Sequence, residues 1–297
     1  MNIRVIIISY NTAEVTLNCI NSIKETAEEA KITVVDNAST DDSILKIMSS
    51  FPDVEIIQNE TNLGYSKAVN IGVSSTTEEI IIISNSDIIY LKDSISSLIK
   101  SIKTGYDLVA PKQLFSNLKP QSSTGFIPSI KHIIINLLLI YPILNKIAIK
   151  FQSTYDYLDG AVLITTKRAF NKVGGFDENF LFYSEDADLS RKYIKNNLKI
   201  KVNYNAEVIH LRGNSTNIDG INENYLKRFV DSKIQLSNKY NTKWVTKLYS
   251  YSELYSTFIF KNIFKFINIF KQNQSIKYKI NYLSKLNSCW KNKIKNN

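Results

Sequence analysis

Three carboxylates stand close together in the stretch FYSEDADLSRK, which covers residues 182–192. Glu185, Asp186 and Asp188 are candidates for general-base chemistry, because a carboxylate within hydrogen-bond reach of a reacting hydroxyl can take its proton. The same stretch also suits a helix start, since Ser184 is a candidate N-cap and acids in a first helical turn complement the helix dipole. The stretch alone leaves both interpretations open.

Polar residues also follow the early apolar runs of the chain. The runs are IRVIIIS (3–9), ITVV (32–35), VEII (54–57), EIIIIS (79–84) and DLVA (107–110), and helical stretches such as 12–26 separate them. This order predicts an α/β fold with a mostly parallel sheet that helices cover on both faces. Ligands of such sheets bind beyond the carboxyl ends of the strands. That is where SYN, DNAST, NETNLGYS and SNSD stand.

The first three of these groups suit a nucleotide. Asp36 in DNAST could accept a hydrogen bond from a base or ribose, and Tyr10 could stack on the base, although DNAST is equally typical of a turn. Gly64 in NLGYSKAVNIG allows close backbone approach at a helix start. The stretch lacks the G-x-G-x-x-G spacing, which disfavours a nicotinamide-type site.

Asp87 and His210 are candidate metal ligands. Asp87, in SNSD, could hold a hard divalent cation that bridges a diphosphate, with phosphate oxygens and water as further ligands. A helix N-cap before IIYLKDSISSLI is the equally weighted alternative for Asp87. His210 closes the run AEVIH. A lone histidine at a strand end is usually structural, so His210 becomes a ligand candidate only if it lies near Asp87.

The pattern of strands and helices is interrupted at residues 111–157, where four prolines and an apolar stretch predict an insertion over the site. It resumes with AVLITT (161–166) and a helix.

The N-terminus reads as a first strand rather than a signal peptide. No apolar run reaches the ~18–20 residues that span a bilayer. Cys19 and Cys289 suggest neither a zinc site nor a disulfide framework, which favours a reducing, cytosolic setting.

Positive charge is concentrated near the C-terminus. Residues 222–297 hold 15 Lys and Arg against 3 acids, while the rest of the chain holds 22 against 24. In 255–271, Lys261 and Lys265 lie on a polar helix face, and six Phe and Ile residues line the other. The helix either packs on the core domain or rests on anionic lipid. We therefore expect two domains, 1–220 and a basic helical extension, 221–297.

Six blocks of the chain, taken in order, closely resemble the family 2 glycosyltransferases, in particular the rhamnosyltransferase-like branch of cell-surface polysaccharide assembly. The blocks are VIIISYN, VVDNASTDDS, NLGYSKAVNIGV, IIISNSDI, DGAVLITTKRAFNKVGGFDENFLFYSEDADLSRK and AEVIHLRGNST. They cover roughly residues 1–216. The resemblance implies a GT-A fold, a nucleotide-diphosphate-sugar donor, a divalent metal (Mn²⁺ or Mg²⁺) and inversion at the anomeric carbon.

The resemblance also assigns residues by position. Base and nucleotide contacts fall on Tyr10, Asn11, Asp36, Asn62, Gly64, Asn85 and Asp87. Asp87 corresponds to the last residue of the metal-binding D-x-D, and His210 to a histidine that ligates metal in some members. Asn85 departs from the motif, because it stands where the first aspartate is expected and so lowers the ligand charge. Asp186 would be the general base, with Glu185 as second choice.

Asp188 and Arg191 are expected to support the acceptor side, or to form only a helical ion pair. The acceptor implied is a glycan on a polyprenyl diphosphate, and the basic tail would hold the protein on the cytoplasmic face of the inner membrane.

The alternatives to a glycosyltransferase are a sugar-phosphate nucleotidyltransferase and a non-catalytic nucleotide-sugar-binding protein. SYNTAE has no glycine, which disfavours the former. A nucleic-acid-binding protein would explain the tail but not the strand-end blocks. dTDP-rhamnose or a UDP-hexose is the expected donor.

Overall fold

The computed structural model describes residues 3–151, 153–180, 183–211 and 223–295. These residues divide into two compact units, the first within Met1–Gly125 and Ile147–Thr216 and the second within Phe126–Lys146 and Asn217–Asn297. The expected domain boundary at 220/221, and the end of the LRGNST block, lie outside the described residues.

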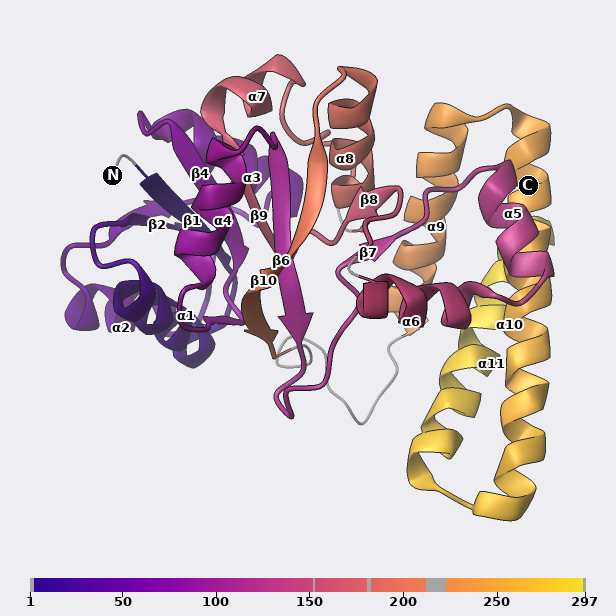
Figure 1. The fold of residues 1–297 in the computed structure, drawn as a ribbon. Helices are drawn as coiled ribbons and strands as arrows, with labels where there is room; N and C mark the ends of the chain where they lie inside the picture. Colours follow the sequence, from indigo (N-terminus) through magenta and orange to yellow (C-terminus); the bar gives the residue numbers. More distant parts are fainter. Residues whose placement is uncertain (1–2, 152, 181–182, 212–222, 296–297) are drawn as a thin grey trace. The chain divides into compact units, whose positions relative to one another are not determined.

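An eight-stranded sheet forms the centre of the first unit (Figure 1), in the order β3-β2-β1-β4-β9-β6-β10-β5. β9 and β5 run antiparallel to their neighbours, and the other pairs are parallel. The strands are β1 (Ile3–Ser9), β2 (Lys31–Asp36), β3 (Glu55–Gln58), β4 (Ile80–Asn85), β5 (Ile88–Tyr90), β6 (Leu108–Leu114), β9 (Val162–Thr166) and β10 (Ile200–His210). A separate two-stranded sheet pairs β7 (Thr124–Gly125) with β8 (Tyr157–Leu158).

Helices cover both faces of the sheet, as predicted. Side chains of successive strand residues point to opposite faces, so Val5 and Ile7 belong to one buried cluster and Ile6 and Ile8 to the other. The helices of this unit are α1 (Ala13–Thr26), α2 (Ser43–Ser50), α3 (Tyr65–Ser75), α4 (Ser94–Lys103), α7 (Lys167–Lys172) and α8 (Glu185–Lys195). α1 and α4 pack on the first cluster, and α3, α7 and α8 on the second. The predicted α/β fold is confirmed.

The structure corrects two details in this unit, one alternative role of Asp87 and the end of one predicted strand. Residues 88–90 form strand β5, and α4 begins only at Ser94, so Asp87 is not a helix N-cap. β5 forms because it pairs with β10, a partner far along the chain. The strand expected at 107–110 continues through Pro111 to Leu114. The proline is tolerated because pairing with β9 ends at Val109, so no ladder on that side needs its missing N–H.

The second unit is helical. Its core gathers Leu226, Val230, Tyr249 and Trp290, among others, around Ile133. The helices are α5 (Ile130–Leu137), α9 (Glu223–Tyr240), α10 (Lys243–Lys271) and α11 (Gln274–Lys295), and α6 (Tyr141–Phe151) begins in this unit. The predicted C-terminal helical extension is confirmed. Residues 126–146, which the sequence places in an insertion, belong to this unit. Both cysteines are free.

The apolar face predicted within 255–271 is not a packing face. Figure 1 shows α10 and α11 side by side as a hairpin, yet Phe258, Phe266 and Phe270 are 49%, 63% and 74% exposed. Among the described residues, no single helix is long and apolar enough to cross a membrane, whereas the pair Ile130–Leu137 and Tyr141–Phe151, bent by 109°, meets the criteria of length and composition together.

Candidate active site

The predicted donor residues meet at the carboxyl edge of the sheet. Ser9 of β1 pairs with Asp36 of β2, so Tyr10 emerges beside Asp36. Tyr10 is 46% exposed, which leaves its ring open to stack on a planar ligand. Asp36 is buried; its Oδ2 accepts a hydrogen bond from the Ser39 N–H at 2.9 Å, and its Oδ1 accepts none. A buried carboxylate oxygen without a donor suits a ligand hydroxyl or N–H.

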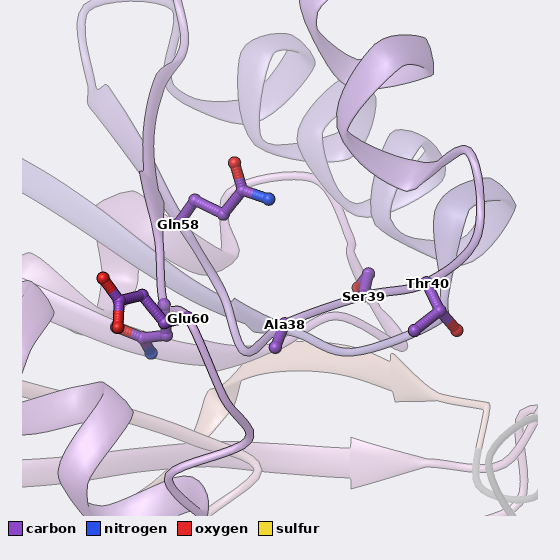
Figure 2. Close-up of a pocket in the computed structure, with 6 residues that line it drawn as sticks. Ala38, Ser39, Thr40, Gln58 and Glu60 are labelled. Atoms are coloured by element: carbon purple, nitrogen blue, oxygen red, sulfur yellow. The ribbon is translucent and has the colours of Figure 1, made fainter.

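A surface pocket of about 420 Å³ lies at the loop that follows Asp36 (Figure 2). Its lining comes from the ends of two strands, with Ala38, Ser39 and Thr40 after β2 and Gln58, Asn59 and Glu60 at the end of β3. Asn11 holds the first wall in place, because its N–H donates to Ser39 Oγ and its Oδ1 accepts from the Thr40 N–H, both at 2.8 Å. The lining is polar, as a ribose or a base edge requires.

Asn37 organises the neighbouring loop, a role that the sequence reading missed. Its Nδ2 donates to Asn62 Oδ1 at 3.0 Å, and its Oδ1 accepts from Asn59 Nδ2 at 3.2 Å and from the Leu63 N–H at 3.0 Å. Asn62 Oδ1 also accepts the Gly64 N–H at 3.1 Å. Gly64 has φ +81, a left-handed backbone that favours glycine. Asn62 thus shapes the loop that leads into α3.

Asp87 and His210 meet in space. Asp87 directly precedes β5, and His210 ends β10, where it pairs with Ile88 of β5; Asp87 Oδ1 lies 3.4 Å from His210 Nε2. Gln113 Oε1 lies 3.0 Å from His210 Nδ1 and accepts a hydrogen bond from it. The orientation of the Gln113 amide is fixed by a second hydrogen bond, in which Gln113 Nε2 donates to Asp159 Oδ1 at 2.9 Å. His210 is therefore held with its Nε2 directed towards Asp87.

This pair fits a divalent cation. Adjacent ligand atoms on an octahedral ion with bonds of about 2.1 Å lie about 3 Å apart, which is close to the 3.4 Å between Asp87 and His210. In the described part of the chain, no group of three or more His, Cys, Asp and Glu side chains could hold a metal ion. Phosphate oxygens and water would be suitable further ligands for a cation at this pair. Asn85, two residues before Asp87, ends β4 at the same edge.

The acidic stretch forms the start of α8, which begins at Glu185. Ser184 occupies the N-cap position, as the helix-start interpretation expected, but its side chain makes no capping hydrogen bond. Asp186 instead binds two backbone groups: its Oδ2 accepts the Gly160 N–H at 3.0 Å, and its Oδ1 accepts the Ala187 N–H at 2.7 Å. The carboxylate of Asp186 is thereby tied to the entry of β9, at the same sheet edge.

The acids of this region affect Tyr65. Burial, and then the negative charges of Glu185 and Asp186, raise the pKa of the Tyr65 hydroxyl well above its usual range. The neutral hydroxyl donates to the Gly160 carbonyl at 3.2 Å. Gly160 is therefore fixed from both sides, by Tyr65 at its carbonyl and by Asp186 at its N–H.

Gln113 links the two halves of the site, and the sequence reading missed it as well. The side chain is buried and bridges the His210 ring and Asp159, the residue before Gly160. No local pattern marks it, because a glutamine in an apolar strand is a signal only once its two partners are known. One hydrogen-bonded route therefore connects the Asp87–His210 pair to the loop that holds Asp186.

Asp188 and Arg191 lie on the same helix as Asp186. Asp188 is fully buried, and its Oδ2 lies 3.5 Å from Lys192 Nζ, one turn later. Lys192 also donates to the Gly175 carbonyl at 2.9 Å, which ties α8 to the GGFDE segment at residues 174–178. Arg191 is half-buried. A supporting role for Asp188 and Arg191 stays a prediction.

Two family models match this chain. The model described as "Glycosyl transferase family 2" matches residues 4–163, more than half of the chain. The model described as "N-terminal domain of galactosyltransferase" matches residues 144–212, which include Asp186 and His210.

Individual relatives are similar over about two thirds of the chain. It is 25% identical over 216 residues to the N-acetylglucosaminyl-diphospho-decaprenol L-rhamnosyltransferase of Mycobacterium tuberculosis, covering 65% of this chain and 70% of the relative. It is 23% identical over 214 residues to the low-salt glycan biosynthesis hexosyltransferase Agl10 of Haloferax volcanii, covering 70% and 67%. It is 26% identical over 219 residues to the glycosyltransferase GlyG of Streptococcus pneumoniae, covering 72% of each.

Solved structures share the fold at low identity. The mannosyltransferase PcManGT of Pyrobaculum calidifontis, in complex with GDP-Man and Mn²⁺, has a TM-score of 0.65 at 13% identity, covering 99% of this chain and 86% of that one. GalNAc-T7 with UDP, GalNAc and Mn²⁺ has a TM-score of 0.64 at 13% identity, covering 85% and 51%. These likenesses confirm the fold that the resemblance implied.

Proposed function

The chain belongs to glycosyl transferase family 2 and has the GT-A fold, and from this premise we propose that it is an inverting transferase. It moves a sugar from a nucleoside-diphosphate donor, dTDP-rhamnose or a UDP-hexose, to a hydroxyl of a glycan acceptor. The observation that carries the proposal is the convergence of the Asp87–His210 pair and the loop that holds Asp186 at one sheet edge, linked through Gln113.

The donor nucleotide binds at the ends of β1, β2 and β3. The exposed Tyr10 ring stacks on the base, and the unpartnered Oδ1 of Asp36 accepts from the base or ribose. The polar pocket at 38–40 and 58–60 lies beside both. The GDP-Man and UDP in the two solved structures of the same fold support a nucleotide-sugar donor.

The diphosphate of the donor lies by Asp87 and His210. It gains negative charge as the bond between the anomeric carbon and the phosphate oxygen breaks. Asp87 and His210 are the residues that would hold a divalent cation, which when bound supplies positive charge to the leaving diphosphate. The Mn²⁺ in both solved structures supports this. Gln113 keeps the His210 ring in the tautomer that can ligate.

Asp186 acts on the acceptor. The acceptor hydroxyl attacks the anomeric carbon from the face opposite the leaving group, and its proton passes to the Asp186 carboxylate as the new bond forms. A positioned base of this kind contributes typically ~10²–10⁴-fold. Two backbone N–H groups hold the Asp186 oxygens, which sets the carboxylate in one orientation before substrate arrives. Glu185 is the second candidate for this role.

The acceptor is proposed to be a glycan carried on a polyprenyl diphosphate, within cell-surface polysaccharide synthesis. The Mycobacterium tuberculosis relative, named as an N-acetylglucosaminyl-diphospho-decaprenol L-rhamnosyltransferase, supports this class. The proposal places the protein at the cytoplasmic face of a membrane.

A release assay for nucleoside diphosphate tests the function. We expect release from one member of a panel of dTDP- and UDP-sugars with Mn²⁺ or Mg²⁺, and a loss of ~10²–10⁴-fold in kcat in Asp186→Asn with donor binding retained. Asp93→Asn is the matched control, because Asp93 is exposed, lies beyond the opposite end of β5 and has a left-handed φ that asparagine tolerates. Full activity of Asp186→Asn, or equal loss in the control, would overturn the assignment.

A further inference from the structure

The end of the α10–α11 hairpin exposes an unusual surface. We call residues 258–285 the hairpin tip: it comprises the second half of α10, the turn at 272–273 and the first half of α11, and none of its residues is buried. The two helices are anchored outside the tip, where Tyr249 of α10 packs edge-on against Trp290 of α11 at 5.9 Å between ring centroids. Figure 1 shows this end extending beyond α9. The tip therefore consists of helix segments whose position is fixed by side-chain packing outside the tip.

Large apolar side chains lie open on the tip. Ile269 and Phe270 are 67% and 74% exposed, and Phe266, 63% exposed, contacts Phe270 edge-on at 5.4 Å. Phe258, Ile263 and Tyr278 are between 42% and 50% exposed. Phe266, Ile269 and Phe270 are three and four positions apart on α10, so they share one helix face and form a patch rather than isolated exposed residues. Contiguous exposed apolar surface marks an interaction site.

The charge of the tip has a single sign. It carries six lysines, at 261, 265, 271, 277, 279 and 285, and no aspartate or glutamate. Two of the lysines lie over aromatic rings, Lys261 at 4.9 Å from the Phe258 centroid and Lys279 at 5.2 Å from that of Phe264. The partner of this surface must therefore accept apolar side chains and carry negative charge.

We propose that the hairpin tip docks on an anionic lipid surface. Aromatic and aliphatic side chains enter the boundary between headgroups and acyl chains, while the lysines remain at the level of the lipid phosphates. A second copy of the chain fits less well, because two tips would bring twelve lysines together without an acid. A nucleic acid would pair with the lysines but would leave Ile269 and Phe270 in water. The proposal rests on no property of the sugar-transfer site.

Co-sedimentation of the full chain with vesicles tests the docking, with no donor or acceptor present. We expect binding to vesicles of phosphatidylcholine with about a third phosphatidylglycerol, and little binding to phosphatidylcholine alone. Neutralising Lys261 and Lys265 to Gln should weaken binding about 30-fold, since each lysine near an anionic surface contributes about fivefold. Lys243→Gln with Lys247→Gln is the matched control: these lysines are exposed on the same helix with the same spacing but lie outside the tip. We expect the control to lose less than threefold.

A second variant separates the apolar contribution from the charge. Phe266→Ser with Phe270→Ser removes two exposed rings, so the thermal transition should stay within a few degrees of wild type while vesicle binding falls at least tenfold. An equal loss of vesicle binding in the Lys261/Lys265 variant and the Lys243/Lys247 variant would show a general effect of charge and overturn the tip as the docking site. Wild-type binding by the Phe variant would do the same. A dimer in light scattering that the Phe variant breaks, without vesicle binding by wild type, would assign the surface to a second copy instead.

Discussion

Gly160 offers a direct test of how Asp186 is positioned. A Cβ added at Gly160 would lie 2.8 Å from Asp186 Cβ, whereas non-bonded carbons pack at about 3.5–4.0 Å. Gly160 is not among the residues with positive φ, so an alanine backbone fits there without strain. The side chain of Asp186 must therefore retreat by about 0.7–1.2 Å, the shortfall from that packing distance. Its 3.0 Å hydrogen bond from the Gly160 N–H lengthens or breaks.

The expected result of Gly160→Ala is a loss of about 100-fold in kcat, because a displacement of about 1 Å at a reacting group costs about that much. Overpacking should lower the free energy of unfolding by about 1–3 kcal/mol. The measurements are the rate of nucleoside diphosphate release with saturating donor and acceptor, and urea unfolding. Donor affinity should stay near wild type, because Asp36 and Tyr10 are untouched.

Gly72→Ala is the control for stability. Its added Cβ would lie 2.6 Å from Ile6 Cγ2, inside the core between α3 and β1 and away from Asp186. It should also destabilise the fold, but keep kcat within about threefold per folded molecule. Wild-type kcat in Gly160→Ala, or an equal loss in Gly72→Ala, would refute the argument that Gly160 sets the position of the Asp186 carboxylate.

Two further predictions concern buried polar groups. Burial alone would raise the pKa of Glu78, but hydrogen bonds from Thr76, Arg4 and a lysine outweigh it and hold that pKa well below its usual range. Glu78→Gln should therefore lower the free energy of unfolding by about 2–3 kcal/mol at pH 7. Urea unfolding should show that this difference from wild type shrinks as the pH falls below about 4. A difference in unfolding free energy that does not depend on pH would contradict the ion-pair explanation. Gln113→Leu should raise the Mn²⁺ concentration for half-maximal activity by about 10–100-fold. Gln121→Leu, which removes hydrogen bonds only to backbone carbonyls, should not; an unchanged Mn²⁺ requirement in Gln113→Leu would contradict its hold on the His210 ring.

Much of the fold follows from local sequence. Runs such as IRVIIIS and EIIIIS are apolar on both faces, and only strands covered by helices on both sides bury both faces at once. Polar residues after these runs must then lie at one sheet edge, because parallel strands end there together. This is why Tyr10, Asp36 and Asp87 could be chosen without coordinates.

Local sequence misled where a distant partner decided the structure. Asp87 stands before a stretch with helical spacing, yet residues 88–90 pair with β10 and become a strand. The Phe and Ile stripe of 255–271 left open whether the helix packs on the core domain or rests on lipid. The core of its unit is filled by residues such as Val230, Leu286 and Trp290, and Phe258, Phe266 and Phe270 of the stripe stay exposed. Hydrophobic periodicity shows that a face is apolar and does not show what covers it.

The sequence by itself determined the α/β alternation, the polar strand ends and the acidic start of α8, because each depends on residues a few positions apart. The tertiary structure alone decided which groups face one another. It brought His210 to 3.4 Å from Asp87 across β5 and β10, and the Gly160 N–H to Asp186. It also gave Gln113 its place between the two halves of the site. These contacts join residues 26 to 123 positions apart, and only the strand order and register of the folded sheet set such distances.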